Sequence, residues 1–66
     1  MKQFTSRSDE FILSELGDRI SQTRLNANIS QKLLAKEAGI SQRTMTRIES
    51  GESVQFINII RVLRAL

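Results

Sequence analysis

The sequence predicts an all-α fold, a compact bundle of four or five helices. Three observations support this prediction: apolar residues recur at helical spacing along the chain, strand-like alternation is absent, and no proline interrupts the pattern. A chain of 66 residues suits one small domain. We therefore expect a single domain over residues 8–66, either complete or a fragment of a longer chain, preceded by a flexible polar arm at residues 1–7.

The first helix is expected to begin after Ser8 and to end at about Asn26. Ser8 is a favourable N-cap, and Asp9 and Glu10 suit the positive end of a helix. The apolar stripe of this helix consists of Leu13, Leu16, Ile20 and Ala27. Gly17 lies within the helix, where glycine costs about 1 kcal/mol relative to alanine.

Two short helices follow, at about residues 31–38 and 42–50. Ser30 and Ser41 are their expected N-caps, and Gly39 is expected to end the first of them in a left-handed conformation. The inward residues are Leu34, Ala35 and Ala38, with Leu33 beside them, and then Met45 and Ile48. Two short helices joined by a glycine-containing turn are typical of a helix-turn-helix, here at about residues 31–50, whereas the alternative is a generic helical hairpin.

Gly51 is expected to end the third helix, and a fourth helix follows to the end of the chain. Its apolar residues at helical spacing are Phe56, Ile59, Ile60, Leu63 and Leu66. Apolar residues are in excess here and around Phe11 and Ile12, and this excess could form a contact between two copies. Phe11 suits equally well a core position beneath the N-terminal arm.

Two opposite charges are expected to face inward. On a helical wheel Arg24 lies within about 20° of Leu13, and Glu49 lies about 40° from Met45. An unpaired inward charge is costly, so we expect a structural ion pair between Arg24 and Glu49 that fixes the third helix against the first. The alternative is that Arg24 extends its charged end into solvent at the end of the helix.

Composition excludes several kinds of site. The chain has no Cys and no His, so we expect no disulfide, no metal site, no cofactor and no histidine base. The seven carboxylates show no paired catalytic spacing, and an enzyme is therefore not expected. No apolar run is long enough for a membrane span and no signal peptide opens the chain, so a cytoplasmic location is expected. A net charge of +3 suits a nucleic-acid partner as well as plain solubility.

The segment LGDRISQTRLNANISQKLLAKEAGISQRTMTRIESGE resembles the phage-repressor and Cro-like helix-turn-helix proteins, the Xre family. The resemblance covers about residues 16–66 and depends on Arg24, Gln31, Ala35, Gly39 and the IESG sequence. It implies a lambda-repressor-like bundle that binds operator DNA, usually as a dimer. The chain departs from the family in two ways, because its first helix extends upstream through DEFIL and the sequence stops where many relatives add a fifth helix.

The resemblance also implies which residues contact DNA. The expected base-reading residues are Gln42, Arg43 and Arg47, and Thr46 either offers its methyl group to a thymine or has no role. Arg47 suits a second base or a phosphate. The phosphate contacts that the resemblance implies are Gln31, Thr44 and Ser50, and Lys32 and Ser41 are expected to add to them from neighbouring positions. In the family the residue at the position of Gln31 braces a phosphate and often touches the residue at the position of Gln42, and its inner Arg–Glu pair corresponds to Arg24 and Glu49.

These residues predict a sequence-specific transcriptional regulator that binds double-stranded DNA through the major groove. Because one recognition helix reads only a few base pairs, we expect a homodimer on an inverted repeat, acting as a repressor. A related alternative is the antitoxin of a toxin–antitoxin pair, which binds both DNA and a toxin protein. From a different class, a protein-binding adaptor would bind DNA weakly and without strong dependence on salt.

Overall fold

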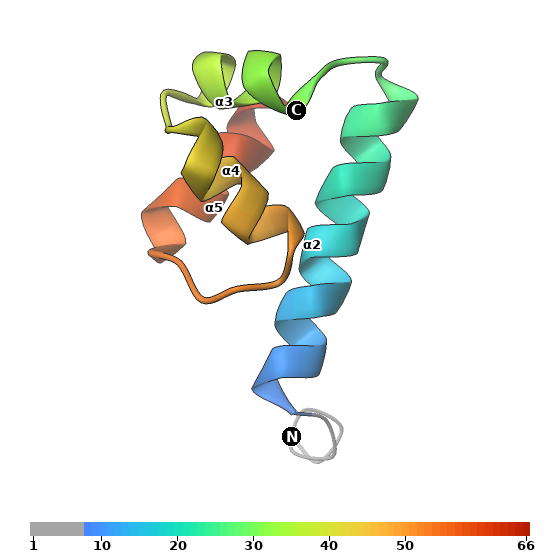
Figure 1. The fold of residues 1–66 in the computed structure, drawn as a ribbon, viewed down its shortest axis with the longest axis vertical. Coiled ribbons are helices and arrows are strands. Elements are labelled where there is room, and N and C mark those ends of the chain that lie inside the picture. Colours follow the sequence, from blue (N-terminus) through green and yellow to red (C-terminus); the bar gives the residue numbers. More distant parts are fainter. Residues whose placement is uncertain (1–7) are drawn as a thin grey trace.

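The computed structural model describes residues 8–66, and the arm predicted at residues 1–7 lies outside the described residues. Within residues 8–66 the helices are α2 (Asp9–Asn26), α3 (Gln31–Ala38), α4 (Gln42–Glu49) and α5 (Phe56–Ala65), as Figure 1 shows. The described part contains no strand, so the predicted all-α fold is confirmed. The helix boundaries follow the sequence closely, and α4 ends one residue before the predicted boundary.

Serine side chains define where α2, α3 and α4 begin. Ser8, Ser30 and Ser41 each accept a hydrogen bond from the backbone N–H three residues later, at 3.0–3.1 Å. Such a bond satisfies one of the N–H groups that a helix leaves unpaired in its first turn. The cap residue of α5, Gln55, makes no side-chain hydrogen bond of this kind.

Left-handed residues follow α2, α3 and α4. Asn28, Gly39 and Gly51 have φ angles of 62°, 73° and 80°. At each of them, the N–H of that residue and the N–H of the next donate to carbonyl groups of the preceding turn, which is the Schellman pattern. These turns reverse the chain sharply and bring α4 against α3, the helix before it.

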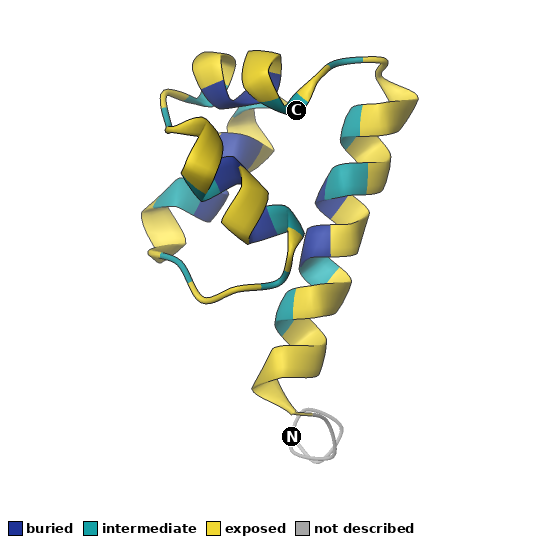
Figure 2. Ribbon diagram, viewed as in Figure 1, coloured by how far each residue is buried: buried dark blue, intermediate teal, exposed yellow. Residues whose placement is uncertain are grey.

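The helices surround one small core. Helix α2 forms one side of the molecule, and α3 lies against both α4 and α5, while α2 packs mainly on α4 (Figure 1). The first turns of α2 extend beyond the other helices and are largely exposed (Figure 2). The buried apolar residues are Ile20, Leu34, Ala35, Met45, Ile48, Ile59 and Val62.

Some residues expected to face inward do not. Ala27 is exposed because α2 ends at Asn26, one residue earlier. Leu33 is 42% exposed, and Phe56, at the start of the apolar repeat in α5, is 74% exposed. The core-facing side of α5 instead includes the fully buried Val62, which is not among the apolar residues expected at helical spacing.

Two glycines allow the backbones of α2 and α4 to meet. A Cβ atom on Gly17 would lie 2.5 Å from the carbonyl oxygen of Ile48 and 2.8 Å from that of Glu49. A Cβ atom on Gly51 would lie 2.7 Å from the Cα atom of Ser14. Because both contacts are with backbone, no side-chain movement could relieve them. Gly17 is therefore required by packing, although from the sequence it was only a weak point in a helix.

Candidate nucleic-acid interface

Helix α4 has one buried face and one exposed polar face. Met45 and Ile48 are 0% and 2% exposed and belong to the core. The exposed residues of the helix and its C-cap form its outward face: Gln42, Arg43, Thr46, Arg47 and Ser50. Folding therefore uses the apolar side of α4 and leaves its polar side available for a ligand.

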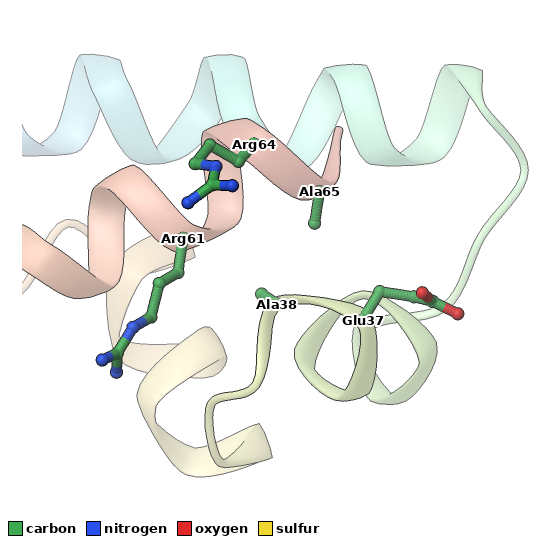
Figure 3. A pocket seen from close by; sticks show the side chains of 5 residues that line it. All are labelled: Glu37, Ala38, Arg61, Arg64 and Ala65. Atoms are coloured by element: carbon green, nitrogen blue, oxygen red, sulfur yellow. The ribbon is translucent and has the colours of Figure 1, made fainter.

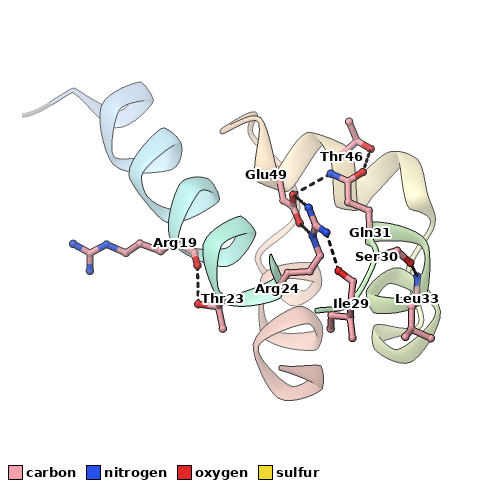
Figure 4. Close-up of polar contacts among 9 residues, drawn as sticks. All are labelled: Arg19, Thr23, Arg24, Ile29, Ser30, Gln31, Leu33, Thr46 and Glu49. Carbon is pink, nitrogen blue, oxygen red and sulfur yellow. Dashed lines mark hydrogen bonds and ion pairs between the residues drawn. The ribbon is translucent and has the colours of Figure 1, made fainter. Parts of the chain in front are cut away.

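An ion pair between Arg24 and Glu49 fixes α4 against α2. Arg24 donates from Nε to Glu49 Oε2 at 2.7 Å and from Nη2 to Glu49 Oε1 at 3.1 Å (Figure 4). Its Nη1 donates to the carbonyl oxygen of Ile29 at 2.9 Å. The side chains of the pair are only 11% and 7% exposed. The structure thus brings together the two charges that the sequence analysis paired, in the two-pronged geometry that favours arginine.

The surroundings of this pair favour its charged form. Burial raises the pKa of Glu49, but hydrogen bonds from Arg24, Gln31 and Ser21 and the charge of Arg24 outweigh it, so the pKa lies below its ordinary value. The hydrogen bond to Glu49 raises the pKa of Arg24 above its ordinary value, against the opposite effect of burial. Both groups are therefore ionised at neutral pH.

Gln31 connects this pair to the outward face of α4. Its Nε2 donates to Glu49 Oε1 at 3.0 Å, and its Oε1 accepts from Thr46 Oγ1 at 3.1 Å. The resemblance implied a contact between Gln31 and Gln42. In the structure Gln31 bonds to Glu49 and Thr46 instead, and Gln42 is exposed. The first residue of α3 thereby holds a polar side chain of α4 in place.

The two arginines of the outward face differ in their contacts. Arg43 makes no hydrogen bond or ion pair within residues 8–66. Arg47 has its Nε 3.4 Å from Glu52 Oε1, and its Nη2 donates to the carbonyl oxygen of Ser53 at 3.3 Å. The turn at Gly51 brings Glu52 back toward α4, where its N–H donates to the carbonyl oxygen of Arg47 at 3.0 Å. A carboxylate therefore lies beside a helix face that appeared from the sequence to have none.

Comparison with known proteins agrees with this geometry. The helix-turn-helix family model matches residues 20–66, which is most of the chain. The chain belongs to the phage-repressor and Cro-like (Xre) helix-turn-helix family. It is therefore a DNA-binding transcriptional regulator of the helix-turn-helix type, with double-stranded DNA as its partner. A search of curated proteins found no match.

In a helix-turn-helix the second helix is the recognition helix, and α4 occupies that position in this regulator. The residues expected to contact phosphate lie around it. Gln31 and Lys32 begin α3, Ser41 and Thr44 lie at the start of α4, and Ser50 is its C-cap. The Ser41 hydroxyl accepts from the Thr44 N–H at 3.0 Å and donates to Thr44 Oγ1 at 2.9 Å. The positive ends of two helices are thus available to an anion, although the Ser41 hydroxyl is engaged in its cap.

Arg61 and Arg64 of α5, which had no assigned role from sequence, lie elsewhere on the regulator. They line a pocket between α5 and the end of α3, together with Glu37, Ala38 and Ala65 (Figure 3). Gln31 is at the opposite end of α3. Both arginines belong to α5 and are therefore not part of the exposed face of α4. Within residues 8–66, none of the helices combines the length and apolarity needed to cross a bilayer.

Proposed function

We propose that this regulator reads an operator with the N-terminal half of α4 and represses transcription by occupying that operator. The observation that supports this is the exposure of Gln42 and Arg43 in the first turn of α4, with no partner for either within residues 8–66. A recognition helix enters the major groove by its N-terminal end. There, Gln can bond to adenine N6 and N7, and Arg to guanine O6 and N7.

Arg47 extends this contact by one helical turn, to a second base or to a phosphate. A guanidinium group has five N–H donors, and one of those on Arg47 donates to the Ser53 carbonyl oxygen, while Glu52 forms an ion pair with the group. The other donors are available to DNA. Because the loop after α4 already holds this side chain, Arg47 loses less freedom on binding than an unattached arginine would.

Phosphate contacts from the starts of α3 and α4 would fix the position of the recognition helix. The proposed residues are Gln31, Lys32, Ser41, Thr44 and Ser50. The amide of Gln31 keeps a second N–H beyond the one that Glu49 accepts, and Lys32 is exposed beside it. Contacts of this kind set register and orientation but carry no sequence information.

A homodimer on an inverted repeat would supply the specificity that one recognition helix lacks. Helix α5 has exposed apolar side chains that such a dimer could bury, including Phe56 at 74%, Ile57 at 45% and Leu63 at 52% exposure. The same exposed surface suits a different protein, so an antitoxin role is the second candidate. Light scattering on the purified chain, with and without co-expressed neighbouring genes, distinguishes a self-dimer from a complex with another protein.

Selection of bound sequences from a random double-stranded DNA pool tests the main proposal. We expect one enriched motif with inverted symmetry and an affinity that falls steeply with salt. Arg43→Ala should relax preference at one base position per half-site, by about 1–3 kcal/mol. Arg64→Ala is the matched control, an exposed helical arginine outside the outward face of α4, and should leave that preference intact. Absence of any motif at moderate salt would refute sequence-specific reading, whereas equal weakening on all sequences would make Arg43 a phosphate contact.

A further inference from the structure

The Thr46 hydroxyl ends a series of hydrogen bonds that begins at the partly buried ion pair of Arg24 and Glu49. Arg24 holds Glu49, and Gln31 Nε2 donates to Glu49 Oε1 at 3.0 Å. Thr46 Oγ1 then donates to Gln31 Oε1 at 3.1 Å. Figure 4 shows these residues passing from α2, through the start of α3, to the outward side of α4.

Each of these bonds fixes the orientation of the next group. Glu49 is ionised, so its two oxygens only accept hydrogen bonds. Gln31 must therefore turn its NH2 group toward Glu49, which leaves its carbonyl oxygen facing Thr46. A carbonyl oxygen also only accepts, and the Thr46 hydroxyl consequently donates its proton to Gln31 rather than to a ligand.

The engaged hydroxyl also selects a side-chain rotamer. A threonine within a helix divides between two χ1 rotamers, because its hydroxyl can also bond to the backbone carbonyl three or four residues earlier. The bond to Gln31 favours the rotamer in which the hydroxyl faces α3. The methyl group of Thr46 then points away from Gln31 (Figure 4), and Thr46 is exposed.

We propose that Thr46 is a specificity-determining residue that recognises the 5-methyl group of thymine, and that Gln31 is the positioning residue that turns the Thr46 methyl group toward the DNA. This inference depends on the proposed function, because it requires α4 to lie in the major groove, where thymine presents its methyl group. The contact is apolar, so Thr46 discriminates without a hydrogen bond to a base.

Uracil substitution tests the methyl contact directly. Each thymine of the selected operator is replaced singly by deoxyuridine, which removes the methyl group and keeps every hydrogen-bonding group. At one position per half-site we expect affinity to fall about fourfold, the equivalent of one buried methyl group. Thr46→Val retains a methyl group and should show a similar penalty at that position. Thr46→Ser lacks the methyl group and should bind both operators equally.

Gln31→Ala tests the positioning role. Without Gln31 the hydroxyl of Thr46 can turn to the backbone carbonyl, so the uracil penalty should shrink from about fourfold to about twofold or less. Lys32→Ala is the matched control, since Lys32 is the next residue and makes no bond to Thr46. It should weaken binding to both operators by the same factor. Each variant is compared with itself on two DNAs, so incomplete folding cancels from the ratio.

The outcomes separate this inference from the proposed function. If no thymine shows a penalty in the wild type, or if the penalty persists in Thr46→Ser, thymine recognition by Thr46 is wrong although operator reading stands. A penalty that is unchanged in Gln31→Ala overturns the positioning role. A selection that yields no motif overturns both the proposed function and this inference.

Discussion

Helices α2 and α5 both support the helix-turn-helix, but they are attached to it by different kinds of contact. Helix α2 meets α4 through backbone at Gly17 and Gly51 and through the ion pair of Arg24 with Glu49. Helix α5 packs on α3 and contributes the buried side chains of Ile59 and Val62 to the core. The α2 attachment adds steric and directional contacts to the apolar packing of Ile20, whereas the α5 attachment is apolar and without preferred direction.

This difference has consequences for substitution. A backbone-to-backbone contact has no side chain that can adjust, and a buried charge requires its one partner. An apolar contact depends mainly on volume and tolerates swaps that conserve it. The position of the recognition helix is therefore specified by its contact with α2, while α5 mainly adds buried apolar surface.

Gly17→Leu should give the largest effect, because its side chain would have to occupy the space of the Ile48 and Glu49 carbonyl groups. We expect the free energy of unfolding to fall by about 3 kcal/mol or more, despite the better helix propensity of leucine. Thermal unfolding followed by circular dichroism measures this loss. Asp18→Leu, an exposed neighbour in the same helix, is the control and should change stability little.

Glu49→Gln should give the next largest effect, since it leaves the charge of Arg24 nearly buried without a counter-charge. We expect a loss of about 2–3 kcal/mol, toward the lower end for buried pairs because both groups keep some exposure. Chemical denaturation of this variant and of Arg24→Met combined with Glu49→Leu compares an isolated charge with an apolar replacement of the whole pair. The double variant should be more stable than Glu49→Gln, because it leaves no unpaired charge. If it is less stable, the ion pair itself stabilises the fold beyond neutralising the charge of Arg24.

Val62→Ala tests the apolar attachment. Val62 is fully buried, and loss of two methyl groups should cost about 2 kcal/mol, through lost transfer energy and a residual cavity. Leu63→Ala, at the next and 52% exposed position, should cost less than half as much. Denaturation curves of the two variants under identical conditions provide the comparison, and equal losses would mean that α5 is attached through its outer side.

Acid should have the smallest effect on stability, and it should act by protonating Glu49, which pairs with Arg24 of α2. The pKa of folded Glu49 lies below its unfolded value, so its stabilisation is complete above the ordinary glutamate pKa of about 4.3. It is lost as the pH falls through the folded value. The stability difference between wild type and Glu49→Gln should therefore narrow below about pH 4. A difference that stays constant down to pH 2 would show that the charge of Glu49 contributes nothing.

Local chemistry explains which features could be predicted from the sequence. Serine caps and the left-handed Gly39 depend on a few adjacent residues, so their positions were readable without tertiary information. The pairing of Arg24 with Glu49 was also readable, because each charge lies on an otherwise apolar helix face. In each case the type of residue, a serine cap, a glycine or an inward charge, favours one particular local structure.

Tertiary packing explains what could not be predicted. Helix α5 is apolar on several sides, so the spacing of its apolar residues did not single out Val62, which is fully buried, or separate it from Phe56, which is exposed. Glycine has no side chain to mark a contact, and the role of Gly17 appears only when α4 is placed against it. Glu52 approaches Arg47 only because Gly51 turns the chain back. The sequence predicted that turn, but not that it places a carboxylate beside the outward face of α4.

The close approach at Gly17 has a consequence for the entropy of DNA binding. With backbone packed on backbone and an ion pair beside it, we expect α4 to tilt little against α2. Association with DNA then does not have to order the recognition helix itself. The remaining cost in conformational freedom falls on exposed side chains such as Gln42 and Arg43, and a residue that never reaches the DNA thereby strengthens its recognition.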